Sequence, residues 1–340
     1  MNKIYFIRAN KTKFGGAEVY LSRLADTLKK QGIEHEILNS NLPKFLPSWI
    51  RVLLFNFKIC KEKQNRFYFS LERVSCPDIY RAGDGVHKVF LEVEKKSRLN
   101  PLHVVYLWIE KQMFNNAKKI IANSKMVKQQ IITTYNIDPK KIEVVYNGIP
   151  LKPLSNFESI KEEFSIKNEK ILLYVGSGFK RKGVEEVLEI ISKLQYQDIK
   201  CFIVGKEKKL NYYKNRSKEL NIEDKIIFTG PRTDVDKFYS MSDIFLFPTH
   251  YEPFSNVILE AMSFKNAIFT TQQNGAAEIL DALYVMEHPK DFSIVEKIDK
   301  LLFDENKLSQ VKEKNIQKIQ NFSIGKNVEE TLSIISKLLK

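Results

Sequence analysis

Short apolar runs alternate with amphipathic segments along most of the chain. Residues 3–7, 171–175 and 244–247 are continuous enough in apolar character for strands that are buried on both faces. Residues 19–28 and 184–194 instead show the apolar spacing of a helix with one buried face. Because strands and helices alternate in this way, the pattern predicts an α/β protein with parallel sheets.

The strand–helix alternation begins twice. The first series ends with a strand predicted at residues 142–148, after which Pro150, Pro153 and polar neighbours indicate a linker. A chain of 340 residues is also long enough for two cores. We therefore predict domains at residues 1–150 and 151–325, with a C-terminal helix at about 326–340 that can pack back on the first domain.

The stretch after the apolar run at residues 244–247 suggests an anion site. A helix is predicted to begin near Ser255 or Asn256, which are both good N-cap residues. Glu252 then lies on the preceding loop and Glu260 about one turn into the helix, with unpaired amide N–H groups between them. These amides and the helix dipole favour phosphate, and a carboxylate on each side suits a nucleotide-sugar. Two ordinary surface glutamates would show the same spacing.

Two glycine-containing turns also follow predicted strands. Gly15 and Gly16 follow the first strand, where glycine lets a ligand approach the backbone. Residues 176–183 follow a later strand and contain Arg181 and Lys182, whose side chains can neutralise a diphosphate. Neither turn matches a dinucleotide-binding fingerprint or a Walker A motif, so NAD binding and ATP hydrolysis are not supported. A tight turn explains Gly15 and Gly16 equally well, because two adjacent glycines are a weak signal. For residues 176–183 the alternative is a solvated basic loop, but three adjacent cations at a strand-to-helix turn favour the phosphate interpretation over it.

Asp84 and His87 are candidate groups in the first half. They follow a strand end predicted at residues 80–82, which places them at the carboxyl edge of a parallel sheet. A catalytic or sugar-binding side chain would project from this edge. Asp84 lies between two glycines, however, and an Asx turn explains it nearly as well.

Arg232, Asp234 and Asp236 follow another predicted strand in the second half. Arg232 is placed where it can lie against a nucleobase or a phosphate. Asp234 and Asp236 resemble a D-x-D motif that binds metal together with nucleotide-sugars. They open a predicted helix, though, where acidic residues are expected for reasons of capping and dipole. We therefore expect no metal site and no cofactor.

The cysteines and the hydropathy limit the possible classes further. Cys60, Cys76 and Cys201 form no C-x-x-C pair, so we expect neither a disulfide framework nor a zinc site, and a reducing cytoplasm as the compartment. No apolar stretch approaches the ~18 residues of a membrane span. Arg8 and Lys11 follow the first apolar run at once, so it predicts a strand and not a signal peptide.

Positive charge is concentrated in the first half of the chain. The formal net charge is +14, and residues 1–150 hold 26 Lys and Arg against 13 Asp and Glu, whereas the other 190 residues hold 29 against 28. Such a field attracts a polyanion: anionic lipid, phosphorylated glycolipid or nucleic acid. Residues 41–66 and 88–119 also interleave aromatic with basic side chains, which suits a membrane surface as well as helices that bury one face.

Taken in order, these motifs resemble those of the GT-B glycosyltransferases, specifically the retaining enzymes of family 4. The resemblance runs over nearly the full length in Phe14–Glu18, Val145–Gly148, Val175–Gly183, Ile227–Gly230, Ser242–Pro248 and the Glu252/Glu260 pair. Residues 80–87 and 175–184 look most like the lipopolysaccharide core glucosyltransferase I branch. The resemblance implies two facing Rossmann-like domains with an interdomain cleft, the first holding the acceptor and the second the donor.

The resemblance also implies a role for each matching residue. Asp84, Lys182 and Glu252 would be catalytic, with Lys182 and Arg181 binding the diphosphate and Glu252 contacting hexose hydroxyls. Glu260 would accept hydrogen bonds from the ribose. The rest of the predicted donor site comprises Gly15, Gly16, Arg232, Phe254, Ser255, Asn256 and Val257. His87 and Glu18 are possible contacts to the sugar or the acceptor.

We therefore expect retaining, metal-independent transfer of a hexose from a UDP-sugar, with UDP-glucose or UDP-galactose as the donor. The expected acceptor is a lipopolysaccharide or lipooligosaccharide core or another membrane-linked glycan, reached from the inner face of the cytoplasmic membrane; nucleic acid is not an expected partner. Two departures from the family are Ser177, where many members have arginine, and Glu252-Pro-Phe-Ser255 in place of E-G-F-G. The alternatives are a UDP-sugar 2-epimerase and a non-enzymatic polyanion-binding protein.

Overall fold

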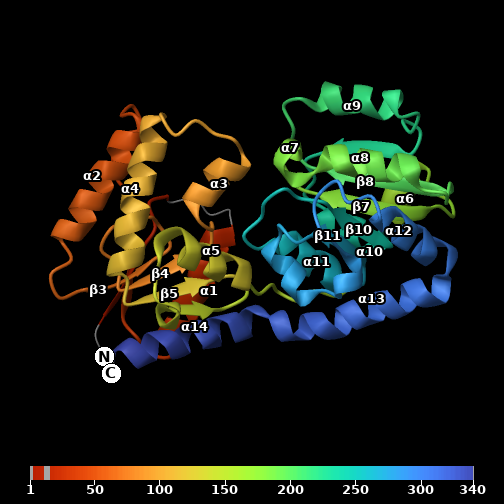
Figure 1. Ribbon diagram of the computed structural model, residues 1–340. Helices are drawn as coiled ribbons and strands as arrows, with labels where there is room; N and C mark the ends of the chain where they lie inside the picture. The colour runs from red at the N-terminus through yellow and green to blue at the C-terminus, as the bar shows by residue number, and fades with distance from the viewer. Residues whose placement is uncertain (1–2, 11–15, 340) are drawn as a thin grey trace. The chain divides into compact units, whose positions relative to one another are not determined.

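The chain forms two compact units, each built on one parallel sheet (Figure 1). The computed structural model describes residues 3–10 and 16–339, with side chains from residue 20 onward in the second range. Unit 1 comprises Met1–Gly148 and Ile324–Lys340, and unit 2 comprises Ile149–Ser323. The prediction of an α/β protein with parallel sheets is confirmed, because every strand pair in both sheets is parallel.

The sheet of unit 1 has the strand order β2-β1-β3-β4-β5-β6. Its strands are β1 (Ile4–Ile7), β2 (His35–Leu38), β3 (Phe67–Ser70), β4 (Ile79–Ala82), β5 (Lys119–Ala122) and β6 (Ile142–Val144). Its helices are α1 (Gly16–Lys30), α2 (Ser48–Lys61), α3 (His87–Val93), α4 (Pro101–Asn116), α5 (Lys125–Tyr135) and α14 (Ile324–Leu339). The sequence did not predict β3, although all four of its residues are buried.

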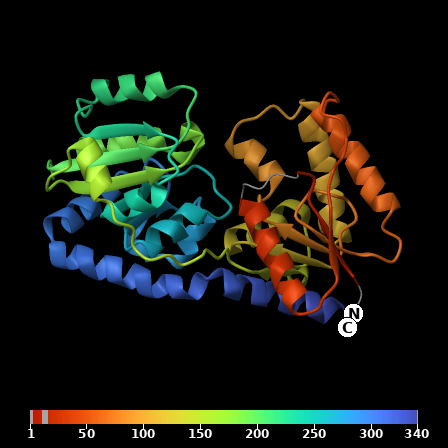
Figure 2. The same cartoon turned by 180° about the vertical axis from the view of Figure 1, so that it is seen from behind.

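The last helix, α14, completes the core of unit 1 beside α1 (Figure 2). Leu24 and Leu28 of α1 share one apolar cluster with Val328, Leu332 and Ile335 of α14. The Tyr20 hydroxyl also lies 3.0 Å from the Thr331 hydroxyl across the two helices. The end of the chain is therefore part of the first unit's core, held there by apolar spacing on one helix face.

A disulfide joins Cys60, at the end of α2, to Cys76, in the segment that precedes β4. The expectation that the cysteines form no disulfide is therefore wrong. Their separation of 16 residues gave no signal, but the fold brings their Cα atoms to 5.7 Å, within the range that a disulfide spans. Because Cys60 and Cys76 are paired, the cysteines no longer indicate a reducing compartment. The third cysteine, Cys201, is free and buried, and burial raises its pKa to about 12.

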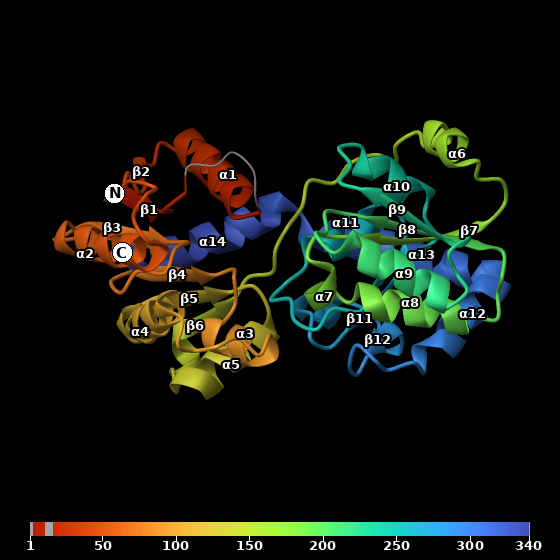
Figure 3. The same cartoon turned by 90° about the horizontal axis from the view of Figure 1, so that it is seen from above.

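The sheet of unit 2 has the strand order β12-β11-β10-β7-β8-β9 (Figure 3). Its strands are β7 (Lys170–Val175), β8 (Ile199–Val204), β9 (Ile226–Gly230), β10 (Ile244–Phe247), β11 (Ala267–Thr271) and β12 (Val285–Met286). Its helices are α6 (Glu158–Phe164), α7 (Phe179–Lys182), α8 (Val184–Lys193), α9 (Leu210–Glu219), α10 (Val235–Met241), α11 (Asn256–Ser263), α12 (Ile294–Phe303) and α13 (Glu305–Ile319). Helices α8 and α9 cover one face of this sheet, and α11 and α13 the other (Figure 1).

Each sheet has one point at which the strand order reverses. In unit 2 this point lies between β7 and β10, which pair directly although two strands separate them in sequence. In unit 1 it lies between β1 and β3. Open α/β sheets bind ligands in the crevice at the carboxyl ends of the two strands beside such a point. The loops after β7 and β10 are therefore the first place to look for a site in unit 2.

Among residues 3–10 and 16–339, no helix combines the length and the apolar character that a membrane span requires.

Candidate functional site

Glycines let the two loops at the switch point of unit 2 approach each other closely. Gly183, between α7 and α8, has φ +82°, and a Cβ atom at this position would lie 2.0 Å from the Pro248 carbonyl oxygen after β10. Gly205, after β8, has φ +153°, and its Cβ would lie 1.9 Å from the Gly176 carbonyl oxygen. Only glycine fits such positions without moving the backbone. The predicted loop at residues 176–183 contains one short helix, α7, which carries its cations.

Arg181 and Lys182 on α7 share one carboxylate with the loop after β10. Arg181 Nη1 donates to Glu252 Oε2 at 2.9 Å, and also to the Tyr251 carbonyl. Lys182 Nζ lies 3.8 Å from the same Glu252 oxygen and 5.5 Å from the centre of the Phe247 ring. All three side chains of this cluster are at most 27% exposed. The cluster carries two positive charges against one negative charge, which suits a partly buried anion site.

The electrostatics of Lys182 follow from this position. Burial lowers its pKa and so does the Arg181 charge, whereas Glu252 and Glu260 raise it; the net effect is a lowered pKa. The side chain also passes close to the backbone, since a Cβ at Gly176 would lie 3.1 Å from Lys182 Cδ. Because the two cations of this cluster outnumber its one carboxylate, an anion bound here would stabilise the charged form of this lysine.

The loop that carries Glu252 is fixed by the segment after β11. The Glu252 amide donates to the Gln273 carbonyl at 2.9 Å, and the Glu252 carbonyl accepts from the Gly275 amide at 3.0 Å. The Asn274 side-chain oxygen accepts from the amides of Ser255, at 3.3 Å, and Ala276, at 3.1 Å. Asn274 is buried, and the sequence did not single it out. It lies three residues after the end of β11 and is the N-cap residue of the 3-10 helix Gly275–Ile279.

Helix α11 begins at Asn256 with Ser255 as its N-cap, as predicted, but the Ser255 hydroxyl makes no cap hydrogen bond. The Val257 amide has no acceptor among the described residues. Phe254 and Ser255 therefore lead into the helix, and Asn256 and Val257 begin its first turn, a few residues after Glu252. A helix start of this kind favours an anion through its amides and its dipole. The contacts of these residues to a donor stay a prediction.

Glu260 lies one turn into α11 and is partly buried. Its Oε2 accepts from the Tyr239 hydroxyl at 3.0 Å. Burial raises the pKa of Glu260, while the Tyr239 hydrogen bond and the charges of Lys152 and Lys182 lower it; the net direction is upward. A partly buried carboxylate with one fixed donor is well placed to accept further hydrogen bonds from hydroxyl groups. Tyr239, on α10, is a neighbour that the sequence did not indicate.

Two more groups lie near the Arg181–Glu252 pair: Tyr174, which is buried, and His250, whose side chain is 37% exposed. The Tyr174 hydroxyl at the end of β7 has no hydrogen-bond partner among the described residues, and it would lie 3.2 Å from a Cβ at Gly176. Burial raises the pKa of Tyr174 far above its usual value. On the other side, His250 Nε2 lies 3.0 Å from Glu186 Oε1, and the His250 amide donates to the Arg181 carbonyl at 2.9 Å. These contacts join α7 and α8 to the loop after β10.

Arg232 is fully engaged with carboxylates. Its Nη1 and Nη2 donate to the two Glu163 oxygens at 2.8 and 2.9 Å, and Nε and Nη2 donate to Asp234 at 2.9 Å. A nucleobase or phosphate would have to compete with these pairs, so the predicted ligand role of Arg232 stays a prediction. Asp234 is the N-cap residue of α10, and Asp236 lies in its first turn, as the sequence predicted.

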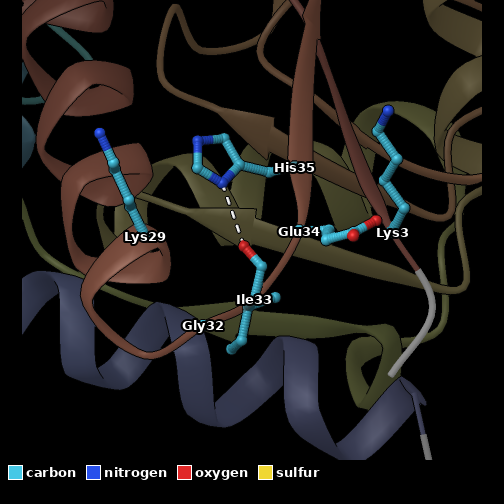
Figure 4. Close-up of a pocket in the computed structure, with 6 residues that line it drawn as sticks. All are labelled: Lys3, Lys29, Gly32, Ile33, Glu34 and His35. Atoms are coloured by element: carbon cyan, nitrogen blue, oxygen red, sulfur yellow. Dashed lines mark hydrogen bonds between the residues drawn. The ribbon is translucent and has the colours of Figure 1, made fainter.

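The described residues contain no group of three His, Cys, Asp or Glu side chains that could hold a metal ion. Two surface pockets lie elsewhere. One of about 440 Å³ lies at the amino-terminal ends of β1 and β2 in unit 1 and is lined by Lys3, Lys29 and His35 (Figure 4). The other, of about 770 Å³, lies between the end of α8 and α12. Neither includes a predicted site residue.

In unit 1, Asp84 and His87 follow β4 as predicted, but their surroundings differ. The Asp84 side chain is 64% exposed and lies 3.9 Å from Arg73 Nη1. His87 is the first residue of α3 and is buried, with Nε2 3.1 Å from His103 Nδ1. Burial, Arg73 and His103 together lower the pKa of His87 to about 4. The His87 imidazole is therefore neutral near pH 7, and at that pH it would accept a proton or form hydrogen bonds as the neutral ring.

The remaining predicted residues of unit 1 are Gly15, Gly16 and Glu18. Gly15 lies outside the described residues. Gly16 and Glu18 belong to α1, which begins at Gly16, but the Glu18 side chain also lies outside the described part of the chain. Their predicted contacts to a donor or an acceptor therefore stay predictions.

Two family models match the chain in succession. Residues 81–152 match the model described as Glycosyltransferase Family 4, and residues 156–318 match Glycosyl transferases group 1. The chain is 28% identical over 253 residues to the capsular polysaccharide biosynthesis glycosyltransferase CapM of Staphylococcus aureus, covering 70% of this chain and 66% of that protein. It is 29% identical over 168 residues to a Campylobacter jejuni diphospho-undecaprenol 4-alpha-N-acetylgalactosaminyltransferase, covering 49% and 45%. The chain thus spans between less than half and about two thirds of the length of these relatives.

Solved structures match over the full length. WaaG, a glycosyltransferase involved in lipopolysaccharide biosynthesis, superposes with a TM-score of 0.81 at 19% identity, covering 98% of this chain and 99% of WaaG. Anabaena HepE in complex with UDP and glucose superposes with a TM-score of 0.76 at 16% identity, covering 99% and 100%. At such identities the likeness shows the fold, which is GT-B. Together with the family models, it supports a transferase.

Proposed function

We propose that the protein is a retaining, metal-independent glycosyltransferase that moves a hexose from a UDP-sugar to a membrane-linked glycan. The observation that carries this proposal is the cluster of Arg181, Lys182 and Glu252 at the switch point of unit 2, with Glu260 partly buried one helix turn further on. Two cations suit a diphosphate, and the carboxylates suit the hydroxyl groups of a hexose and a ribose. The site therefore has groups suited to the diphosphate, the hexose and the ribose of a nucleotide-sugar.

In this proposal the protein contributes electrostatics and positioning. As the bond between the sugar and the diphosphate breaks, negative charge grows on the departing nucleotide, and Arg181 and Lys182 stabilise it. Glu252 keeps both cations aligned when the site is empty. When the donor is bound, Glu252 accepts hydrogen bonds from the hexose hydroxyls. The acceptor hydroxyl attacks the face from which the nucleotide leaves, which retains the anomeric configuration. Asp84 of unit 1 is the catalytic residue assigned to the reacting sugar on the acceptor side.

The donor is tested first. Nucleotide-sugars, beginning with UDP-glucose and UDP-galactose, are screened by thermal shift. The true donor should raise the melting temperature of the protein, since a ligand that binds only the folded state stabilises it. Nucleotide release is then measured with and without a lipooligosaccharide core acceptor, in the presence and absence of EDTA. We expect release that depends on the acceptor and is unchanged by EDTA. Proton NMR of the product reports the anomeric configuration.

The same assay distinguishes the alternatives. A UDP-sugar 2-epimerase would convert the donor without an acceptor and would yield an isomeric UDP-sugar. A non-enzymatic polyanion binder would release no nucleotide at all. Loss of nucleotide release on adding EDTA would contradict metal independence. A product with inverted anomeric configuration would contradict the retaining mechanism.

We further propose that unit 1 meets an anionic membrane through α2 and α4, which pack against each other. Phe57 of α2 and Trp108 of α4 are 60% and 46% exposed, and Phe45, before α2, is 85% exposed. Basic residues of these helices and of the segments before them are exposed as well, namely Lys44, Lys58, Lys95, Lys96, Arg98 and Lys111. Aromatic side chains with neighbouring cations are typical of a surface that enters the headgroup layer. A glycan acceptor on a lipid would then be held near unit 1.

A further inference from the structure

A buried carboxylate in unit 1, Glu110 of α4, has no part in the proposed function so far. It is fully buried, in the middle of a helix that otherwise buries only apolar residues. A charge in such a place is costly unless it is paired and hydrogen-bonded. The surroundings of Glu110 meet that condition with several donors.

Two of these donors are backbone amides at the start of α3. The His87 amide donates to Glu110 Oε1 at 2.8 Å, and the Lys88 amide lies 3.4 Å from Oε2. The N-cap residue of α3, Val86, has no side-chain acceptor of its own. Glu110 therefore caps α3 from a different helix. It fixes the point at which the chain leaves the Asp84 loop.

A third donor connects Glu110 to Asp84 itself. Arg73 Nε lies 3.4 Å from Glu110 Oε1, and Nη1 of the same guanidinium lies 3.9 Å from Asp84 Oδ2. Arg73 is mostly buried and lies over the Tyr106 ring, which limits its movement. The Tyr135 hydroxyl of α5 supplies a fourth donor to Glu110, at 2.7 Å. Four elements of unit 1 thus meet at one carboxylate.

We infer that Glu110 is a positioning residue that holds Asp84 and His87 in place for transfer, an inference that rests on the function proposed above. It acts at both ends of the short segment between them: through Arg73 on the Asp84 side chain, and through the amides on the start of α3. Asp84 is exposed, and among residues 3–10 and 16–339 its side chain has no other hydrogen-bond or ion-pair partner that would fix it. A displacement of about 1 Å at a reacting group can cost ~100-fold in rate.

The test replaces Glu110 with glutamine, which keeps the shape but turns one acceptor into a donor that faces other donors. We expect the transfer rate constant kcat of Glu110→Gln to fall about 10- to 100-fold. The donor dissociation constant, measured by calorimetry, should stay within about twofold of the wild-type value, because the Arg181–Lys182–Glu252 cluster lies in unit 2. Glu92→Gln is the matched control: it removes the same charge from α3, where Glu92 is exposed and pairs with Arg98. This control should transfer at the wild-type rate.

A double-mutant cycle separates positioning from general loss of stability. If Glu110 acts through Asp84, Asp84→Asn with Glu110→Gln should be no slower than Asp84→Asn alone, within about twofold. The inference would be overturned if the rate losses of the two single variants multiplied in the double variant, or if Glu110→Gln transferred at the wild-type rate. If Glu110→Gln fails to fold, Arg73→Lys takes its place in the cycle, because lysine keeps the charge but cannot reach both carboxylates with two separate groups.

A second measurement keeps this test independent of the proposed function. Amide hydrogen exchange at His87 and Lys88 should become at least about tenfold faster in Glu110→Gln than in Glu92→Gln, since the amides lose their carboxylate. Unchanged exchange would overturn the inference even if the wild type transferred sugar. If the wild type transfers no sugar from any donor but Glu110→Gln still shows the faster exchange, only the proposed function is contradicted.

Discussion

At the scale of single residues, Lys182 is the sharpest test of the donor site. Lys182→Ala should lower kcat by about 10²- to 10³-fold, because the charge that stabilises the departing diphosphate is lost. Its effect on the melting temperature should be small, since the lysine costs desolvation energy where it lies. Steady-state kinetics and thermal unfolding measure the two effects. Lys180→Ala is the control, because Lys180 lies exposed on the same short helix.

Glu260 tests the recognition of the donor. Glu260→Gln should raise the donor dissociation constant by about 5- to 20-fold, corresponding to ~1–2 kcal/mol for weaker hydrogen bonds to the ribose. The Tyr239 hydrogen bond can persist in this variant, because the glutamine oxygen still accepts it. Isothermal titration calorimetry with the donor from the thermal-shift screen gives the result. An unchanged affinity would remove Glu260 from the ribose site.

His87 gives a prediction for the dependence of stability on pH. In the folded protein its pKa is lowered to about 4, whereas in the unfolded chain it is about 6.5. Between these values the unfolded state binds a proton that the folded state does not, so His87 lowers the free energy of unfolding as the pH falls from 6.5 towards 4. His87→Asn should therefore lose less stability than the wild type over this window. Urea unfolding followed by fluorescence at pH 7, 5.5 and 4.5 measures the difference; parallel curves would contradict it.

At the scale of elements, the turn between α7 and α8 depends on Gly183. Gly183→Ala should destabilise unit 2 by at least ~2–3 kcal/mol, because the new Cβ would strike the Pro248 carbonyl at 2.0 Å in addition to the left-handed backbone strain. The control is Gly178→Ala, which has φ +77° but no atom within 4 Å of the new Cβ. It should cost only the ~1 kcal/mol of the left-handed conformation. Thermal unfolding compares the two, and equal losses would show that the close approach is unimportant.

The sequence predicted the elements that local chemistry determines. Pro248 indicates the end of β10, and Ser255 indicates the start of α11. From these two bounds the sequence predicts Glu252 on a loop and Glu260 one turn into a helix. Periodicity did not find β3, because four residues, Phe67–Ser70, are too few for it to show. Helix α7 was predicted as a loop for the same reason, since it has only four residues between two glycines.

Long-range partners could not be predicted in this way. Glu163 lies 69 residues from Arg232 in sequence, and no local pattern indicates that the two form a bidentate pair. Cys60 and Cys76 likewise meet only because α2 and the segment before β4 lie side by side in the fold. Glu110 did leave a signal, as a lone acidic residue on the buried face of an apolar helix. Its four donors, however, come from elements up to 37 residues away.

At the scale of the whole molecule, the concentration of positive charge in the first half predicts salt-dependent membrane binding. Vesicles with anionic lipid should bind the protein at low ionic strength and release most of it near 0.5 M salt, where the Debye length falls to about 4 Å. Phe57→Ser with Trp108→Ser should weaken binding at both salt concentrations, because the apolar contribution is lost. Flotation assays measure both effects. Equal binding to neutral vesicles would contradict the electrostatic part.

The position of α14 has a consequence for how the protein is made. Residues 324–339 leave the ribosome only after unit 2, yet Val328, Leu332 and Ile335 belong to the core that Leu24 and Leu28 begin. During synthesis, the first 148 residues must therefore wait with an exposed apolar groove while the whole of unit 2 is translated and folds. A nascent chain stalled before residue 324 should expose this groove to chaperones. The unit made first would be the last to reach its native state.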